Sequence, residues 1–137
     1  MKVMLDTCVV LDYLQGREPF FDDALNVFIA IANDEIHGFI TASSVTDIYY
    51  IIQRCTHKHE RSKEILNNLI KLISILDTTS EDCINALVSK VKDYEDAVMI
   101  ESSRRAKIDY IVTRNTRDYE KSSVRVVSPL ELLDAIS

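Results

Sequence analysis

The chain has 137 residues, of which 47% are hydrophobic and 28% charged, and its formal net charge is −6. This composition predicts one globular domain over residues 1–137 and excludes a disordered chain, while the acidic balance argues against broad electrostatic attraction to nucleic acid. No apolar run approaches the ~18 residues of a membrane span, no signal peptide is recognisable, and the three cysteines lack metal-ligand spacing, so we expect a cytoplasmic protein without membrane contact.

Short apolar runs alternate with stretches of helical periodicity along the chain. The predicted strands are KVML at residues 2–5, GFITA at 38–42, ISIL at 73–76, YIVT at 110–113 and VRVV at 124–127. Apolar stripes with helical spacing lie within residues 21–32, 45–52, 65–73 and 84–91. Uncharged strands that alternate with helices predict a three-layer α/β/α fold with a central, mainly parallel sheet, short strands and six to seven helices.

Polar side chains recur where these strands end or in the helix turn that follows. They are Asp6, Asp47, Asp93, Glu95, Asp96, Asn115 and Asp118. Ligands of open α/β sheets bind beyond the carboxyl ends of the strands. We therefore expect these side chains to converge in space.

Each acid also has a structural explanation. Asp6 or Thr7 would cap the helix that follows the first strand. Ser44 with Asp47 resembles a capping box, and Asp93 with Asp96 has the same spacing. Acids in the first turn of a helix also interact favourably with the helix dipole. Taken singly, each acid fits either explanation about equally well, except Glu95, for which we favour a solvent-facing position.

The acids taken as a set favour a metal site. Converging carboxylates repel one another, and a cation makes such a cluster tolerable. An all-oxygen donor set is typical of Mg²⁺ or Mn²⁺ rather than Zn²⁺, and the three histidines show no ligand pattern. The sequence therefore predicts Mg²⁺ or Mn²⁺ as the cofactor.

Four segments together resemble the PIN domain, the family that includes the VapC-type toxin ribonucleases. They are LDTCVVLDYL, SSVTDIYYI, KDYEDAVMIESSRRAKIDYIVTRNTRDY and VVSPLELL, and they keep the family's order over nearly the whole chain. The resemblance places metal-site acids on Asp6, Asp47 and Asp96, and it places the fourth position on Asn115 or Asp118.

The sequence departs from the family pattern at two positions. Cys8 stands where the family often has Asn, and Asp47 stands where Glu is frequent. Because the side chain of Asp47 is one methylene shorter, it must approach a metal more closely or bind it through water. An Asn115 in the fourth position would leave the site with one negative charge fewer.

The resemblance implies metal-dependent hydrolysis of RNA phosphodiester bonds by the toxin of a toxin–antitoxin pair. One or two ions would lower the pKa of a bound water and stabilise charge on the phosphate. Thr7 and Thr113 are candidate hydroxyls for orienting the carboxylates. Arg114 and Arg117 are candidate phosphate contacts, although exposed surface charge explains them as well.

The resemblance also implies protein partners, because VapC-type toxins are usually inhibited by an antitoxin and often form homodimers. Aromatic residues would serve such interfaces or, more usually, the core. They are Tyr49, Tyr50, Tyr94 and Tyr119.

Two other functions stay open on the sequence alone. A PIN-like module that binds RNA or protein without cutting would use the same acids as helix caps. A haloacid-dehalogenase-type phosphohydrolase also begins with a strand that ends in aspartate, but it needs a second aspartate two residues later, where this chain has Cys8.

Overall fold

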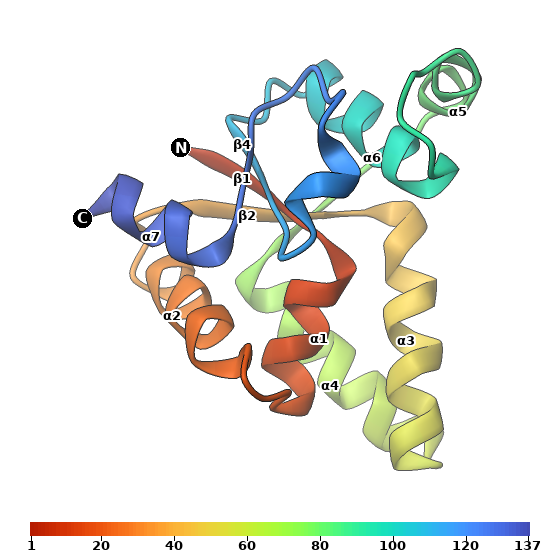
Figure 1. The fold of residues 1–137 in the computed structure, drawn as a ribbon. Helices are drawn as coiled ribbons and strands as arrows, with labels where there is room; N and C mark the ends of the chain where they lie inside the picture. Colours follow the sequence, from red (N-terminus) through yellow and green to blue (C-terminus); the bar gives the residue numbers. More distant parts are fainter.

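A central sheet with helices on both faces forms the protein in the computed structural model, which describes residues 1–137 (Figure 1). The strands are β1 (Lys2–Leu5), β2 (His37–Thr41), β3 (Ser74–Leu76), β4 (Tyr110–Val112) and β5 (Val126–Val127). All neighbouring strands are parallel, in the order β3-β2-β1-β4-β5. The predicted α/β/α fold is confirmed, and each predicted strand is present.

Six α-helices and one 3-10 helix lie between the strands, and a seventh α-helix follows the last strand. They are α1 (Thr7–Gln15), α2 (Phe21–Ala32), α3 (Ala42–Thr56), α4 (His59–Leu72), α5 (Ser80–Ala86), α6 (Tyr94–Arg105), the 3-10 helix η1 (Thr116–Tyr119) and α7 (Pro129–Ile136). None of these helices has the length and apolar character needed to cross a membrane.

Alternate residues of the central strands supply two hydrophobic cores. Val3 and Leu5 of β1 join one core with residues of α1, α2, α3, α4 and α7, whereas Met4 joins the other with residues of α6. In β4, Val112 and Ile111 divide in the same way. Figure 1 shows the first group of helices on one side of the sheet and α5 and α6 on the other. Because both faces of these strands are covered, their sequences are apolar without alternation.

The predicted helical stripe over residues 84–91 is wrong. Helix α5 already ends at Ala86, and Ile84, Leu87 and Val88 are 62%, 71% and 85% exposed. Of the four stripe residues only Val91 is buried. The apolar residues have helical spacing, but the chain leaves the helix between them, so they share no common face.

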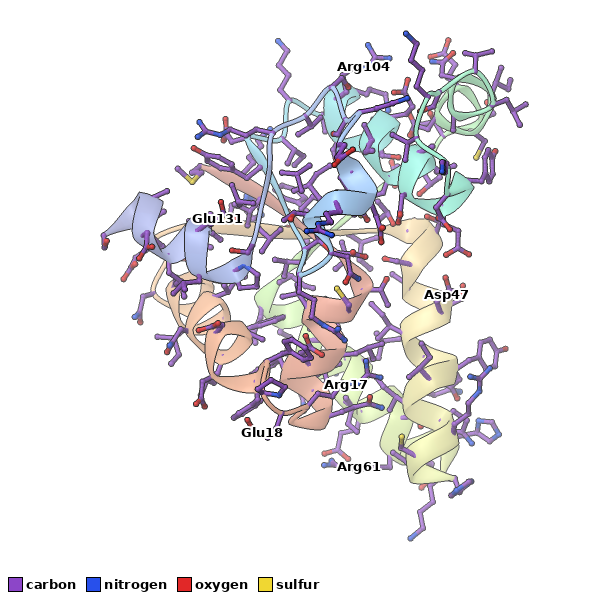
Figure 2. The ribbon with its side chains drawn as sticks, in the orientation of Figure 1. Arg17, Glu18, Asp47, Arg61, Arg104 and Glu131 are labelled. Atoms are coloured by element: carbon purple, nitrogen blue, oxygen red, sulfur yellow. The ribbon has the colours of Figure 1, made fainter.

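Several cations lie on outer helix surfaces, away from the ends of the strands. Figure 2 shows Arg61 and Arg104 on the outside of α4 and α6. Arg61 pairs with Glu64 at 3.0 Å, and Arg104 pairs with Glu101 at 2.9 Å. Surface ion pairs of this kind contribute little to stability. Because Arg61 and Arg104 are already paired with glutamates, they are less available to bind a ligand.

Candidate functional site

Asp6 stands at the carboxyl end of β1, beside the end of β4. Its backbone N–H donates to the Val112 carbonyl at 3.0 Å, and it occupies the N-cap position of α1 without a side-chain capping bond. Its carboxylate Oδ2 instead accepts hydrogen bonds from Thr113 Oγ1 at 2.8 Å and from the Tyr119 hydroxyl at 3.2 Å. These donors are 107 and 113 residues away in the sequence. Asp6 is therefore a member of a long-range cluster and not a helix cap.

Tyr119 connects Asp6 to a second acid, Asp96. Its hydroxyl lies 2.8 Å from Asp96 Oδ1, and the residue is only 2% exposed. Burial and the charges of the two carboxylates raise the pKa of Tyr119, so the phenol keeps its proton and remains a donor. The sequence suggested Tyr119 only as a core or interface aromatic. Its position directly after Asp118 in the TRNTRDY segment was the available signal for a role in the site.

The carboxylate of Asp96 lies among other acids in the first turn of α6. Burial raises the pKa of Asp96 to about 6, and the charges of Asp6, Asp93 and Asp118 act in the same direction, against the hydrogen bond from Tyr119. Asp93 is the N-cap of α6 and accepts a hydrogen bond from the Asp96 backbone N–H at 3.0 Å, so its predicted capping role is confirmed. The acids around Asp96 are thus close enough to disfavour its charged form.

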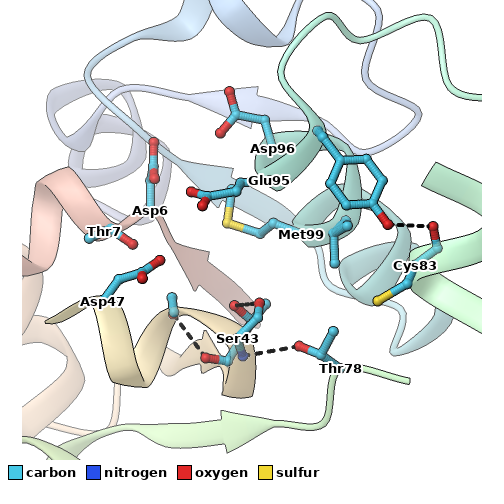
Figure 3. Close-up of a pocket in the computed structure, with 13 residues that line it drawn as sticks. Asp6, Thr7, Ser43, Asp47, Thr78, Cys83, Glu95, Asp96 and Met99 are labelled. Carbon is cyan, nitrogen blue, oxygen red and sulfur yellow. Dashed lines mark hydrogen bonds between the residues drawn. The ribbon is translucent and has the colours of Figure 1, made fainter. Parts of the chain in front are cut away.

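Asp47 approaches this cluster from the neighbouring helix. A cavity of about 190 Å³ opens beside Asp6 and Asp96, and Asp47 of α3 and Glu95 of α6 also line it. Figure 3 shows Asp6, Asp47 and Glu95 arranged around one space, with Thr7 on its wall. Asp6 at the start of α1, Glu95 and Asp96 in the first turn of α6, and Asp47 further along α3 therefore face the same cavity.

The predicted capping box of Ser44 and Asp47 is wrong. Helix α3 begins at Ala42, and the Ser44 hydroxyl donates to the Thr41 carbonyl at 2.8 Å. The Asp47 carboxylate makes no hydrogen bond to another protein group. Because the helix starts earlier than the spacing suggested, Asp47 has no capping task and its carboxylate is free.

Asp118 lies in an adjoining cleft rather than in the cavity. This cleft of about 280 Å³ is formed by η1 and the connection between α5 and α6. Asp118 and Asn115 are both exposed, but the charge of Asp118 raises the pKa of Asp96, whereas Asn115 is neutral and donates its backbone N–H to Thr113 Oγ1 at 3.1 Å. None of the cations that line the cleft belongs to an ion pair. These cations are Lys90, Lys92, Arg117 and Lys121.

Arg114 is engaged inside the protein. Its Nε lies 2.9 Å from Oδ2 of Asp12, which is 2% exposed, and its guanidinium carbon lies 4.1 Å from the ring centre of Phe20. The ion pair engages Nε and Nη2, the edge of the guanidinium that would bind a phosphate in bidentate fashion, and Phe20 lies against the guanidinium. We therefore withdraw Arg114 as a candidate phosphate contact and keep Arg117.

The donor set fits a hard divalent cation that has few direct protein ligands. No three His, Cys, Asp or Glu side chains lie close enough together to hold a metal ion as a group. The two acids that share a donor are Asp6 and Asp96, and each has a second carboxylate oxygen without a hydrogen bond. Mg²⁺ commonly takes one or two carboxylates and keeps several waters. A cation here would also relieve the repulsion around Asp96.

Asp96→Asn is expected to stabilise the metal-free protein at pH 8 by about 1–2 kcal/mol. This is less than the full pKa shift of Asp96 would give, because the residue is only half-buried and solvent screens its charge. The pKa of Asp96 is raised from 3.8 to about 6 on folding, so its contribution to stability is fully present below pH 3.8 and is lost as the pH rises through about 6. Urea denaturation in EDTA between pH 4 and 8 measures the gain, which should shrink as the pH falls. Glu95→Gln, in the same helical turn, controls for the helix dipole. An equal gain for both variants would contradict a specific repulsion at Asp96.

Tyr119→Phe is expected to lower the free energy of unfolding in EDTA by about 1.5–3 kcal/mol, because the variant loses a buried hydrogen bond to a charged group. Tyr50→Phe is the matched control, since Tyr50 is 61% exposed and its hydroxyl has no protein partner. Urea denaturation of both variants measures the difference. Equal stabilities would show that the Tyr119 hydroxyl does not hold the two carboxylates.

Comparisons with known proteins agree with this geometry. The chain matches the family model of the PIN domain over residues 2–117. One similar solved structure is VapBC2 from Rickettsia felis bound to a promoter DNA fragment (TM-score 0.70, 12% identity, 93% of this chain and 98% of that chain covered). Another is a toxin–antitoxin complex from Klebsiella pneumoniae (TM-score 0.67, 18% identity, 93% of this chain and 97% of that chain covered). A third is VapC20 from Mycobacterium tuberculosis, a sarcin-ricin loop cleaving toxin (TM-score 0.67, 12% identity, 90% of this chain and 98% of that chain covered).

At identities this low, the similarity to these structures establishes the fold alone. No curated protein matches the sequence significantly. The family model, however, covers most of the chain, from the first strand to the loop that contains Asn115. This protein therefore belongs to the PIN-domain family.

Proposed function

We propose that this PIN domain is a metal-dependent nuclease that hydrolyses RNA phosphodiester bonds as the toxin of a toxin–antitoxin pair. The observation that carries the proposal is the pairing of Asp6 and Asp96 through Tyr119, with the pKa of Asp96 raised to about 6 by burial and neighbouring acids. Helix capping gives no reason to place mutually repelling carboxylates together, whereas a bound cation offsets the cost of doing so. The similarity to VapC-type toxins supports the same reaction.

The chain's residues take separate roles in this proposal. Asp6 and Asp96 would hold Mg²⁺ or Mn²⁺, and Asp47 and Asp118 would contribute through bound water. When bound, the metal would supply an activated water and stabilise charge on the phosphate. Thr113 fixes the orientation of Asp6 through its hydrogen bond, which is the usual task of a group behind a metal ligand.

Asp118 fits the fourth position of the metal site better than Asn115 does. Its negative charge acts on Asp96, while Asn115 is neutral and its backbone N–H serves Thr113. Arg117, beside Asp118, contacts substrate phosphates together with the lysines of the same cleft. Thr7 on the cavity wall is a further candidate for orienting a carboxylate or a bound water.

An antitoxin is the proposed protein partner. The Rickettsia felis and Klebsiella pneumoniae structures are toxin–antitoxin complexes with the same fold. A basic group of such a partner would be attracted to the acids of the cavity and would exclude substrate from it. We further propose that the protein forms a homodimer and that it acts in the cytoplasm, where the RNA substrate is present.

Cleavage of labelled single-stranded RNA by the purified protein tests the proposal. We expect cleavage in millimolar Mn²⁺ or Mg²⁺, none in EDTA, and recovery when the metal is restored in excess. RNA binding without cleavage in any of these conditions would favour a non-catalytic binding module. The family match gives no support to a haloacid-dehalogenase-type reaction, so release of phosphate from phosphate monoesters is not expected.

A further inference from the structure

We infer that a groove along α3 binds the RNA strand, with Tyr50 as a platform for base stacking and Arg54 as a phosphate contact. This inference rests on the proposed function and assigns substrate contacts that the metal-site acids do not provide. The groove has a volume of about 340 Å³ and continues from the acids of the cavity. Its lining residues are Asp6, Thr7, Asp47, Tyr50, Ile51, Arg54 and Glu95.

The spacing along α3 matches a short stretch of nucleic acid. Asp47, Tyr50 and Arg54 follow one side of the helix at positions i, i+3 and i+7. At 1.5 Å per residue, Asp47 and Arg54 are about 10 Å apart along the helix axis, roughly the length of three stacked nucleotides. Figure 2 shows Asp47 on the half of α3 nearer the sheet, and the helix continues away from the sheet towards its end at Thr56. A strand whose phosphate meets the acids can therefore pass Tyr50 and reach Arg54.

The Tyr50 ring is exposed and already oriented. It is 61% exposed, and it lies edge-to-face with Tyr49, with ring centroids 5.2 Å apart and an interplanar angle of 87°. Tyr49 is in turn fixed by a hydrogen bond between its hydroxyl and Nδ1 of His59 at 2.8 Å. This arrangement holds the Tyr50 ring in place while leaving a face open to solvent. Exposed aromatic faces of this kind stack with any base, independently of its identity.

Arg54 is the only cation that lines the groove. It forms no ion pair, in contrast to Arg61 on the next helix. The groove's other charged residues are acids at the end where the metal site lies, so the charge changes sign along α3. An anionic strand that is anchored by a cation at the acids would meet its next attractive charge at Arg54.

RNA binding by the Asp6→Asn protein tests this inference without cleavage of the probe. The probe is a fluorescein-labelled single-stranded RNA of mixed sequence and roughly 12 nucleotides, and binding is followed by anisotropy in Mn²⁺ over a range of salt concentrations. We expect added Tyr50→Ala to weaken binding by about 5- to 100-fold without changing the salt slope, and Tyr50→Phe to preserve binding. Arg54→Ala should weaken binding and reduce the slope of log K against log salt by about 0.7.

Lys63→Ala is the matched control for Arg54→Ala, because Lys63 is an exposed cation on α4 outside the groove. It should change neither affinity nor slope, and melting temperatures check that each variant is folded. If the parent binds RNA and Tyr50→Ala binds it equally well, the inference is overturned while the proposed nuclease stands. If the parent binds no RNA although the wild type cleaves it, Tyr50 and Arg54 do not hold the strand and the inference is overturned while the proposed nuclease stands. If the wild type also cleaves no RNA, the proposed function fails and the inference fails with it.

Discussion

Asp6→Asn is expected to lower the rate of RNA cleavage in Mn²⁺ by roughly 10²- to 10⁴-fold, because a catalytic metal supplies several kcal/mol of charge stabilisation. The substitution keeps the shape of the side chain, and an amide oxygen in place of Oδ2 still accepts the hydrogen bonds from Thr113 and Tyr119. It also removes one of the charges that repel Asp96. The melting temperature in EDTA should therefore stay at or above that of the wild type while cleavage is lost.

Asp34→Asn is the matched control for this charge change. Asp34 lies in the exposed turn between α2 and β2 with φ 58°, a left-handed conformation that Asn adopts readily. The Asp34→Asn protein should cleave RNA at the rate of the wild type. Retained cleavage in Asp6→Asn would remove Asp6 from the metal site. A fall in the melting temperature of Asp6→Asn would instead mean that Asp6 is needed for the fold, which the hydrogen bonds retained by the amide oxygen argue against.

The sheet could be predicted from the sequence because its central strands are covered on both faces. Val3, Met4 and Leu5 face two different cores, so no polar residue interrupts the run that marks the strand. The stripe at Ile84 and Leu87 failed because periodicity records spacing and not whether a partner surface exists. Local patterns therefore located elements well wherever tertiary packing agreed with them, and missed the exposed end of α5.

The acids of the site could be located from the sequence, but not the contacts that hold them. Parallel strands bring Asp6 and Asp96 to one edge, which topology predicts without atomic detail. The hydroxyl of Tyr119, in contrast, reaches Asp6 across 113 residues of sequence, and no local pattern records such a contact. The predicted capping box of Ser44 and Asp47 is wrong for a related reason. The same two residue types at this spacing fit either a helix cap or the interior of a helix that begins earlier.

Arg114→Met is expected to lower the free energy of unfolding by about 3–5 kcal/mol, because it leaves the buried carboxylate of Asp12 without its partner. The variant also loses the contact of the guanidinium with Phe20. Urea denaturation in EDTA measures the loss, and Asp12→Leu combined with Arg114→Met should recover most of it, since no buried charge then remains. Arg117→Met, an exposed position in the same loop, should cost under about 0.5 kcal/mol. If both variants lose equally little stability, Arg114 is again a candidate phosphate contact. If only Arg114→Met loses much stability, Arg114 serves the fold, and Arg117 in its cleft remains the candidate contact for substrate phosphates.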